Sequence, residues 1–191
     1  MLDIEQYLFD RSASFPIDIG ARTQCQIGGC IATNAGGIRW IKNNSVHANC
    51  LGLKAVLPNG EILDTMSTLR KDNTGYDLKQ LFIGSEGTLG IVTEVAMLCG
   101  PLPSGRCTAL LGCKTYNDVL EMVKSAKVEL GDILSIIEYM DAQSIQLATT
   151  QQDRESLLNG QSMSDHFIIL EVESYGSTYF GQDRLMKFVN K

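Results

Sequence analysis

Gly28-Gly29-Cys30-Ile31-Ala32-Thr33-Asn34-Ala35-Gly36-Gly37 carries more information about this chain than any other stretch. Two Gly-Gly pairs bracket small residues, and glycine lets a backbone reach positive φ and approach a ligand closely. Adjacent amides in such turns form anion-binding nests, and Thr33 and Asn34 add side-chain donors. The stretch therefore suits a pyrophosphate or a flat polar ring lying along the main chain. A tight structural crossover accounts for it equally well.

A second glycine-rich stretch, Gly84-Ser85-Glu86-Gly87-Thr88-Leu89-Gly90-Ile91, leads into alternating residues that predict a buried strand over 91–99. Such a loop places its last backbone groups beside whatever fills the neighbouring cleft. Taken alone, it is also typical of a plain glycine-rich turn. Two such loops close together indicate a cofactor with an extended, phosphate-bearing body.

The spacing of the 18 glycines excludes two common nucleotide sites. No two glycines are separated by a single residue, so the G-x-G-x-x-G motif of a Rossmann fold cannot occur. No Gly-Lys pair is present to form a phosphate-binding P-loop.

Composition excludes further classes of protein. The 191 residues include 22 acidic and 16 basic ones, a net charge of −6 that argues against nucleic acid or an anionic membrane surface as partner. No apolar stretch approaches the roughly 18 residues that a membrane span requires. The first ten residues carry three acidic side chains and no basic one, unlike a targeting presequence.

The histidines and cysteines predict no metal centre. Two histidines, His47 and His166, lie far apart, and the six cysteines show no C-x-x-C spacing. We expect the cysteines to be reduced thiols that behave as small core residues, with a reactive thiol as the lesser alternative.

Hydrophobic periodicity predicts two parts that meet at Pro101–Gly105, residues 1–102 and 103–191. In the first part we expect strands at 51–57 and 61–64 around a turn at 58–60, a surface loop at 68–75 and helical turns at 76–82. In the second we expect strands at 107–112, 133–140 and 166–172, helices at 116–130, 141–150 and from 178, and a polar loop at 151–165. Thr115 is the expected N-cap of the helix at 116–130, whose apolar stripe is Val119, Leu120, Met122, Val123 and Ala126.

The two glycine loops and the hairpin between them resemble the FAD-binding (PCMH) domain of vanillyl-alcohol-oxidase-type oxidoreductases, in the branch of D-lactate and glycolate dehydrogenases. The matching residues are Pro16–Gly20, Gly28–Gly37, Leu51–Leu53 and the long, specific run Ser67–Ile91. The resemblance continues more weakly through Glu138–Asp141 to the end.

The resemblance implies an α+β fold: the second α+β lobe of the FAD-binding domain over 1–102, then part of an α+β substrate or cap domain over 103–191. It also implies that FAD borders residues from both glycine loops. These are Cys25, Gln26, Gly28, Gly29, Thr33, Asn34, Ala35, Gly36, Glu86, Gly87, Thr88, Gly90, Ile91 and Val92.

The implied activity is that of an FAD-dependent dehydrogenase. Members of the family oxidise a small-molecule D-2-hydroxy acid by hydride transfer to the flavin, and the resemblance favours D-2-hydroxyglutarate, which becomes 2-oxoglutarate. A separate electron acceptor, either electron-transfer flavoprotein or a quinone-linked one, a mitochondrial location and a homodimer are also implied.

The chain departs from the family pattern in several places. The family's pyrophosphate loop, its His-x6-His metal motif and the Arg and Lys that hold the substrate lie outside residues 1–191, so we assign no catalytic or metal-binding residue and expect the chain alone to be inactive. Asn43-Asn44 replaces the family's Tyr-Gly, although asparagine tolerates a left-handed backbone. His47 is interpreted as a loop residue near the flavin rather than a base. The alternative is a non-catalytic flavin-binding or interaction module.

Overall fold

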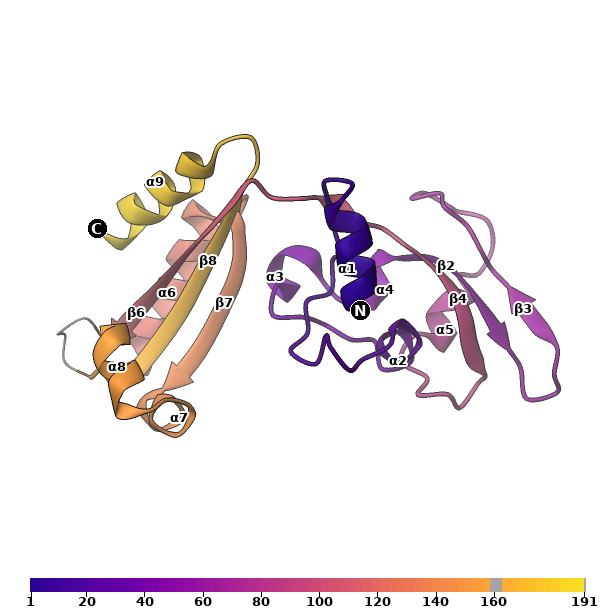
Figure 1. Ribbon diagram of the computed structural model, residues 1–191, viewed down its shortest axis with the longest axis horizontal. Coiled ribbons are helices and arrows are strands. Elements are labelled where there is room, and N and C mark those ends of the chain that lie inside the picture. The colour runs from indigo at the N-terminus through magenta and orange to yellow at the C-terminus, as the bar shows by residue number, and fades with distance from the viewer. Residues whose placement is uncertain (159–162, 191) are drawn as a thin grey trace. The chain divides into compact units, whose positions relative to one another are not determined.

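The computed structural model describes residues 1–158 and 163–190, and the chain divides into two compact units, Met1–Leu102 and Pro103–Lys191 (Figure 1). We call them unit 1 and unit 2. Helices and strands mix in both, so the α+β class is confirmed. The division falls where the sequence places a boundary, and the roles assigned to the two parts stay predictions.

Unit 1 is built on a small antiparallel sheet with the strand order β3-β2-β4. Its strands are β2 (Cys50–Val56), β3 (Ile62–Asp64) and β4 (Ile91–Met97), and a second sheet joins β1 (Ala13–Ser14) to β5 (Gly100–Pro101). Its helices are α1 (Leu2–Phe9), α2 (Ile27–Ala32), α3 (Trp40–Asn43), α4 (Val46–Asn49) and α5 (Lys79–Phe82). The predicted hairpin between β2 and β3 is confirmed, and its turn contains Gly60 at φ 87°.

Two expectations for unit 1 are wrong. The strand predicted as buried over 91–99 is β4, which ends at Met97, lies at the edge of its sheet and contains no fully buried residue. The first glycine stretch opens as helix α2 rather than as a loop, because Ile27 and Ile31 supply apolar side chains on either side of Gly28-Gly29. Ile31 is fully buried, so tertiary packing outweighs the poor helix propensity of glycine.

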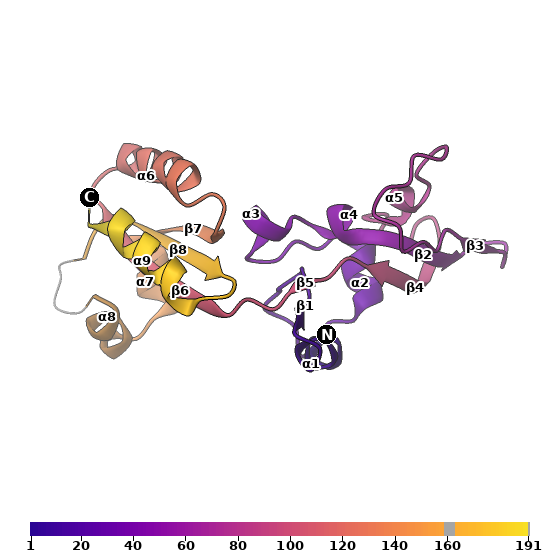
Figure 2. The same cartoon turned by 90° about the horizontal axis from the view of Figure 1, so that it is seen from above.

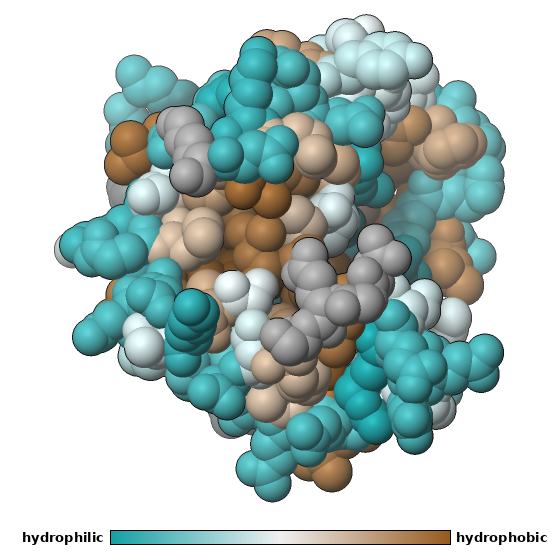
Figure 3. All heavy atoms as spheres, turned by 90° about the vertical axis from the view of Figure 1, so that its left-hand side faces the viewer, coloured by the Kyte–Doolittle hydropathy of each residue, from teal (hydrophilic) through white to brown (hydrophobic). Residues whose placement is uncertain are grey.

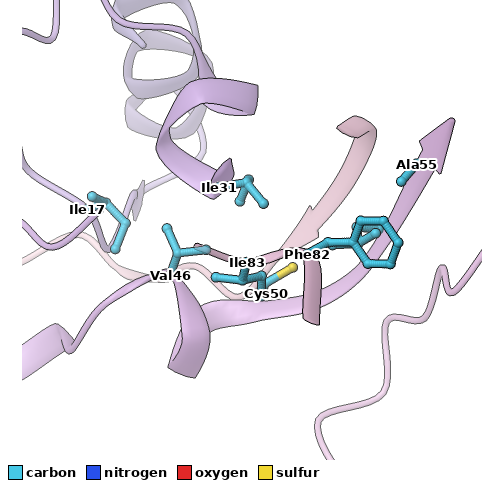
Figure 4. Close-up of a cluster of buried hydrophobic side chains, with 8 residues drawn as sticks. Ile17, Ile31, Val46, Cys50, Ala55, Phe82 and Ile83 are labelled. Carbon is cyan, nitrogen blue, oxygen red and sulfur yellow. The ribbon is translucent and has the colours of Figure 1, made fainter. Parts of the chain in front are cut away.

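The core of unit 1 joins the helices to the sheet (Figure 4). Ile31 of α2, Val46 of α4, Leu53 of β2 and Phe82 of α5 are each at most 5% exposed. Burying such side chains contributes roughly 1.5–3 kcal/mol each. This cluster therefore fixes α2, which contains Gly28-Gly29, and the end of α5, which the second glycine-rich segment follows.

Asn44 has the positive φ that the sequence anticipates, but its backbone is strained. Its φ of 59° and ψ of −162° lie outside the left-handed helical region, in a region that essentially only glycine occupies. We expect Asn44→Gly to raise the free energy of unfolding by about 1 kcal/mol, measured by denaturant titration. Ser45→Gly, where φ is −96°, is the control and is expected to be neutral or destabilising. A destabilised Asn44→Gly variant would contradict the prediction.

Unit 2 is a three-stranded antiparallel sheet with the order β6-β8-β7, in which β8 is central. Its strands are β6 (Gly105–Cys113), β7 (Leu134–Asp141) and β8 (His166–Ser174), and its helices are α6 (Tyr116–Glu129), α7 (Ala142–Ala148), α8 (Gln151–Leu158) and α9 (Thr178–Val189). Helix α6 packs along the sheet, and α9 packs on β6 and β8 (Figure 2). The buried residues include Val119, Ala126, Leu170, Val172 and Leu185.

The predicted N-cap of α6 is confirmed. The Asp118 amide donates to Thr115 Oγ1 at 3.2 Å, and the Thr115 amide donates to Asp118 Oδ2 at 2.8 Å. This capping box satisfies amides that the helix leaves unpaired. The bond from the Thr115 amide also holds the pKa of Asp118 below its ordinary value.

Two expectations for unit 2 are wrong. Part of the polar loop predicted over 151–165 is helix α8, and residues 159–162 lie outside the described residues, as does Lys191 at the end of the last predicted helix. A capping box that the prediction missed accounts for α8, because the Asp153 amide donates to Thr150 Oγ1 at 3.2 Å and the Thr150 amide to Asp153 Oδ2 at 3.0 Å. Leu120, assigned to the buried stripe of α6, is 46% exposed.

Candidate cofactor-binding site

The fold of unit 1 brings the two glycine-rich segments together. The Gly84 amide donates to the Ile31 carbonyl at 3.1 Å, and the Glu86 amide donates to the Ala32 carbonyl at 2.9 Å. These bonds join the end of α2 to the loop that precedes β4, and α2 also packs against β4. Predicted site residues from both segments therefore lie on one continuous edge of unit 1.

Asn34 connects this edge to a third segment. Its backbone has a φ of 48°, and its Oδ1 accepts a hydrogen bond from the His47 amide at 3.1 Å. The Val46 amide donates to the Ala35 carbonyl at 3.2 Å. The turn after α2 is therefore fixed by the first turn of α4, and the Asn34 carboxamide serves in the turn as an acceptor.

His47, whose amide bonds to Asn34, also contacts Gln80. The His47 ring Nδ1 contacts Gln80 Oε1, and Gln80 Nε2 donates to the His47 carbonyl at 3.2 Å. His47 lies in helix α4, so its assignment to a loop is wrong. Gln80 could not be found from the sequence, because 33 positions separate it from the histidine it contacts.

The second segment forms a strained turn. Glu86 and Gly87 have φ values of 50° and 81°, and the turn is closed by the Thr88 amide, which donates to the Ser85 carbonyl at 3.0 Å. Thr88 Oγ1 donates to the same carbonyl at 2.6 Å. Glu86, Gly87 and Thr88 are exposed beside the end of α2, so their outer surface is open to a ligand.

The space around each glycine separates structural glycines from the others. A Cβ atom on Gly37 would lie 2.3 Å from the Asp18 carbonyl oxygen, and one on Gly52 would lie 2.3 Å from the Ser67 nitrogen. On Gly90, a predicted cofactor residue, it would lie 2.6 Å from the Val56 carbonyl oxygen. At these three positions the protein's own backbone requires glycine.

Gly28 and Gly29 differ from those glycines. Neither has a positive φ, a Cβ on Gly28 would only touch the Val92 carbonyl at 3.6 Å, and one on Gly29 would meet nothing within 4 Å. Both lie inside a helix, where glycine costs roughly 1 kcal/mol relative to alanine. Packing and backbone conformation therefore give no reason for glycine at Gly29.

The remaining predicted residues surround this pair. Gln26, Thr33, Gly36 and Ile91 are exposed, and Ile91 is 65% exposed at the start of β4. Cys25, Ala35 and Val92 are half-buried. Thr33 Oγ1 donates to the Gly29 carbonyl at 2.9 Å, so the hydroxyl proton predicted for a ligand is used within α2. Within residues 1–158 and 163–190, no group of three metal-ligating side chains gathers.

Residues 1–66 match the family described as an FAD binding domain. The chain is 48% identical over 145 residues to the mitochondrial D-2-hydroxyglutarate dehydrogenase of Rattus norvegicus, covering 76% of this chain and 27% of that protein. It is 46% identical over 175 residues to the mitochondrial D-2-hydroxyglutarate dehydrogenase of Arabidopsis thaliana, covering 92% and 31%. The corresponding protein of Danio rerio is 40% identical over 189 residues, covering 99% and 35%.

Among solved structures, the chain is similar to an alkyldihydroxyacetonephosphate synthase, with a TM-score of 0.75 and 20% identity over 98% of this chain and 36% of that chain. At this identity the likeness concerns the fold alone. The chain spans 27% to 35% of the length of the three D-2-hydroxyglutarate dehydrogenases named above.

Proposed function

Because this chain belongs to the FAD-binding oxidoreductases of the D-2-hydroxyglutarate dehydrogenase type, we propose that its two glycine-rich segments form one edge of an FAD site. The edge runs from Cys25 through Gly36 and continues through Glu86 to Val92. It contains the exposed end of α2, the turn fixed by Asn34, and the first residue of β4.

Gly29 is the observation that carries this proposal. A ligand that lies against α2 accounts for a helical glycine whose side-chain position is empty and whose backbone is not strained. The neighbouring Gly28 gives the same close approach next to the Val92 carbonyl. An extended FAD would need close contact with the backbone over several residues, and the missing side chains of Gly28 and Gly29 allow such contact along α2.

Titration of the purified chain with FAD tests the proposal. We expect a saturable shift of the flavin absorbance bands together with quenching of flavin fluorescence. Riboflavin, which lacks the phosphates and the adenosine, is the control ligand and is expected to bind more weakly. A flavin spectrum that stays unperturbed at saturating FAD would contradict the proposal.

For the longer protein of which such a segment is part, we propose oxidation of D-2-hydroxyglutarate to 2-oxoglutarate. The relatives are named for this substrate, and an FAD held at this edge would supply the acceptor for the hydride that leaves the α-carbon of a hydroxy acid. In residues 1–158 and 163–190 we assign no group to substrate activation, so this chain is expected to hold FAD without reducing it. Bleaching of the bound flavin by D-2-hydroxyglutarate would contradict that expectation, and flavin binding without bleaching supports a non-catalytic module.

The proposal extends to partners and location. We propose a separate electron acceptor, of the electron-transfer flavoprotein or quinone-linked class, and a mitochondrial location like that in the relatives' names. We also propose a homodimer, which is supported by an apolar patch ringed by hydrophilic side chains on unit 2 (Figure 3). Among the described residues, no helix is both long and apolar enough to cross a membrane.

A further inference from the structure

Two cysteines, Cys25 and Cys30, lie on either side of the N-cap of helix α2. Gln26 is the N-cap of this helix, with an extended backbone at φ −114° and ψ 151°, and the Cys30 amide donates to the Gln26 carbonyl at 3.2 Å. Cys25 is therefore the residue before the N-cap, and Cys30 is the fourth residue of the helix. Side chains at these two positions characteristically pack on each other across the first turn.

The surroundings of Cys30 give a second observation. Cys30 is 4% exposed, and burial raises the pKa of its thiol. The neighbouring Cys25 sulfur raises the pKa of Cys30 further, because a negative charge on one sulfur disfavours a second charge beside it. The positions of the two cysteines before and after the N-cap place both side chains at the first turn of α2. Cys25 is half-buried and Cys30 is buried, so Cys25 is the one that reagents reach.

We propose that Cys25 and Cys30 form a reversible disulfide that hydrogen peroxide makes and a dithiol reductant breaks. The Cys25 thiolate attacks one peroxide oxygen, which yields a sulfenic acid and releases hydroxide. The Cys30 sulfur then attacks the Cys25 sulfur, forms the S–S bond and releases water. In total, two thiols lose two electrons and two protons to one peroxide, which becomes two waters.

The chain between the two cysteines can accommodate this bond. A disulfide needs Cα atoms roughly 4.4–6.8 Å apart, so some adjustment of the first turn of α2 must be possible. Gly28 and Gly29 lie in this turn, and a Cβ on either would meet no atom closer than 3.6 Å. The backbone of this turn can therefore adjust, because glycine restricts φ and ψ least and no neighbouring atom is packed tightly against it.

The disulfide would change the candidate cofactor edge, an inference that rests on the proposed function. Oxidation draws the Cys25 sulfur inward to Cys30 and fixes the turn that contains Gly28-Gly29. We therefore expect the oxidised chain to bind FAD at least tenfold more weakly than the reduced chain. By linkage, bound FAD is expected to disfavour disulfide formation by the same factor.

Peptide mass spectrometry of the whole chain tests the disulfide without reference to FAD. After treatment with hydrogen peroxide, blocking of free thiols and digestion with trypsin, the peptide between Arg22 and Arg39 contains both cysteines. We expect this peptide to be two hydrogens lighter and unalkylated, and dithiothreitol to restore two alkylation sites. Cys25→Ser and Cys30→Ala are each expected to abolish the bond. Cys107→Ser, which changes a half-buried cysteine on β6, leaves it intact.

The outcomes separate this inference from the proposed function. Alkylation of both cysteines after peroxide treatment, or a sulfinic acid at Cys25 in place of the bond, would overturn the disulfide. FAD titration of the reduced and oxidised chains gives the second readout. If the disulfide forms but FAD affinity is unchanged, the disulfide is established and the proposed position of FAD at Gly28-Gly29 is wrong.

Discussion

Gly29→Ala is expected to weaken FAD binding by roughly 5- to 150-fold while the free energy of unfolding rises by about 0.5–1 kcal/mol. The gain in stability follows because alanine is the better helix former, and its Cβ would meet no protein atom within 4 Å. The loss of affinity follows because the methyl group would occupy the space in which the proposed FAD lies. Overpacking of a closely fitted contact costs typically 1–3 kcal/mol, and 1.4 kcal/mol is a tenfold change in Kd.

The measurement is a pair of titrations on each variant, one with FAD and one with urea. Gly20→Ala is the matched control, since Gly20 also has an ordinary φ and nothing within 4 Å of a Cβ, but lies outside the candidate edge. It is expected to leave FAD affinity unchanged. Equal affinity in the Gly29→Ala and wild-type chains would disprove close contact at α2, whereas a loss of stability would mean that the glycine serves the fold.

The elements that the sequence predicts well are those with a local signal. The turn at Gly60 and the N-cap at Thr115 are set by residues within a few positions of each other, and both are confirmed. Helix α2 has no such signal, because Gly28-Gly29 is unfavourable for a helix, and the burial of Cys30 and Ile31 against the rest of unit 1 stabilises it. Packing against residues far away in the sequence therefore determines that Gly28-Gly29 forms a helix rather than a loop.

The same limit applies to the candidate site. Both glycine-rich segments could be identified as candidate site segments from the sequence, because glycines are seldom clustered so closely. Their mutual hydrogen bonds, and the support from His47 and Gln80, depend on residues far apart in the chain. The sequence also could not separate a structural glycine from one that faces a ligand. That distinction requires knowing what surrounds the missing Cβ, which differs completely between Gly29 and Gly37.

Gly37→Ala is accordingly expected to have the opposite effect to Gly29→Ala, and to destabilise unit 1 by about 3 kcal/mol. Its Cβ would lie 2.3 Å from the carbonyl oxygen and 2.4 Å from the nitrogen of Asp18, and backbone atoms cannot turn aside as the end of a side chain can. The same carbonyl accepts a hydrogen bond from the Ile38 amide at 2.9 Å, so moving it apart also breaks that bond. The adjacent segment contains Ile17, a core residue that is 1% exposed.

Thermal and urea unfolding of the variant would measure this loss, which corresponds to a Tm lowered by roughly 10 °C or more for a unit of this size. Gly100→Ala is the control, because a Cβ there would make only an ordinary contact at 3.8 Å with Ser14 Oγ, and it is expected to change stability by less than about 0.5 kcal/mol. A Gly37→Ala chain as stable as wild type would mean that the segment around Asp18 yields easily. Affinity for FAD separates the two glycines further: any Gly37→Ala protein that remains folded is expected to bind FAD normally, since this glycine faces the chain's own backbone rather than the edge formed by α2.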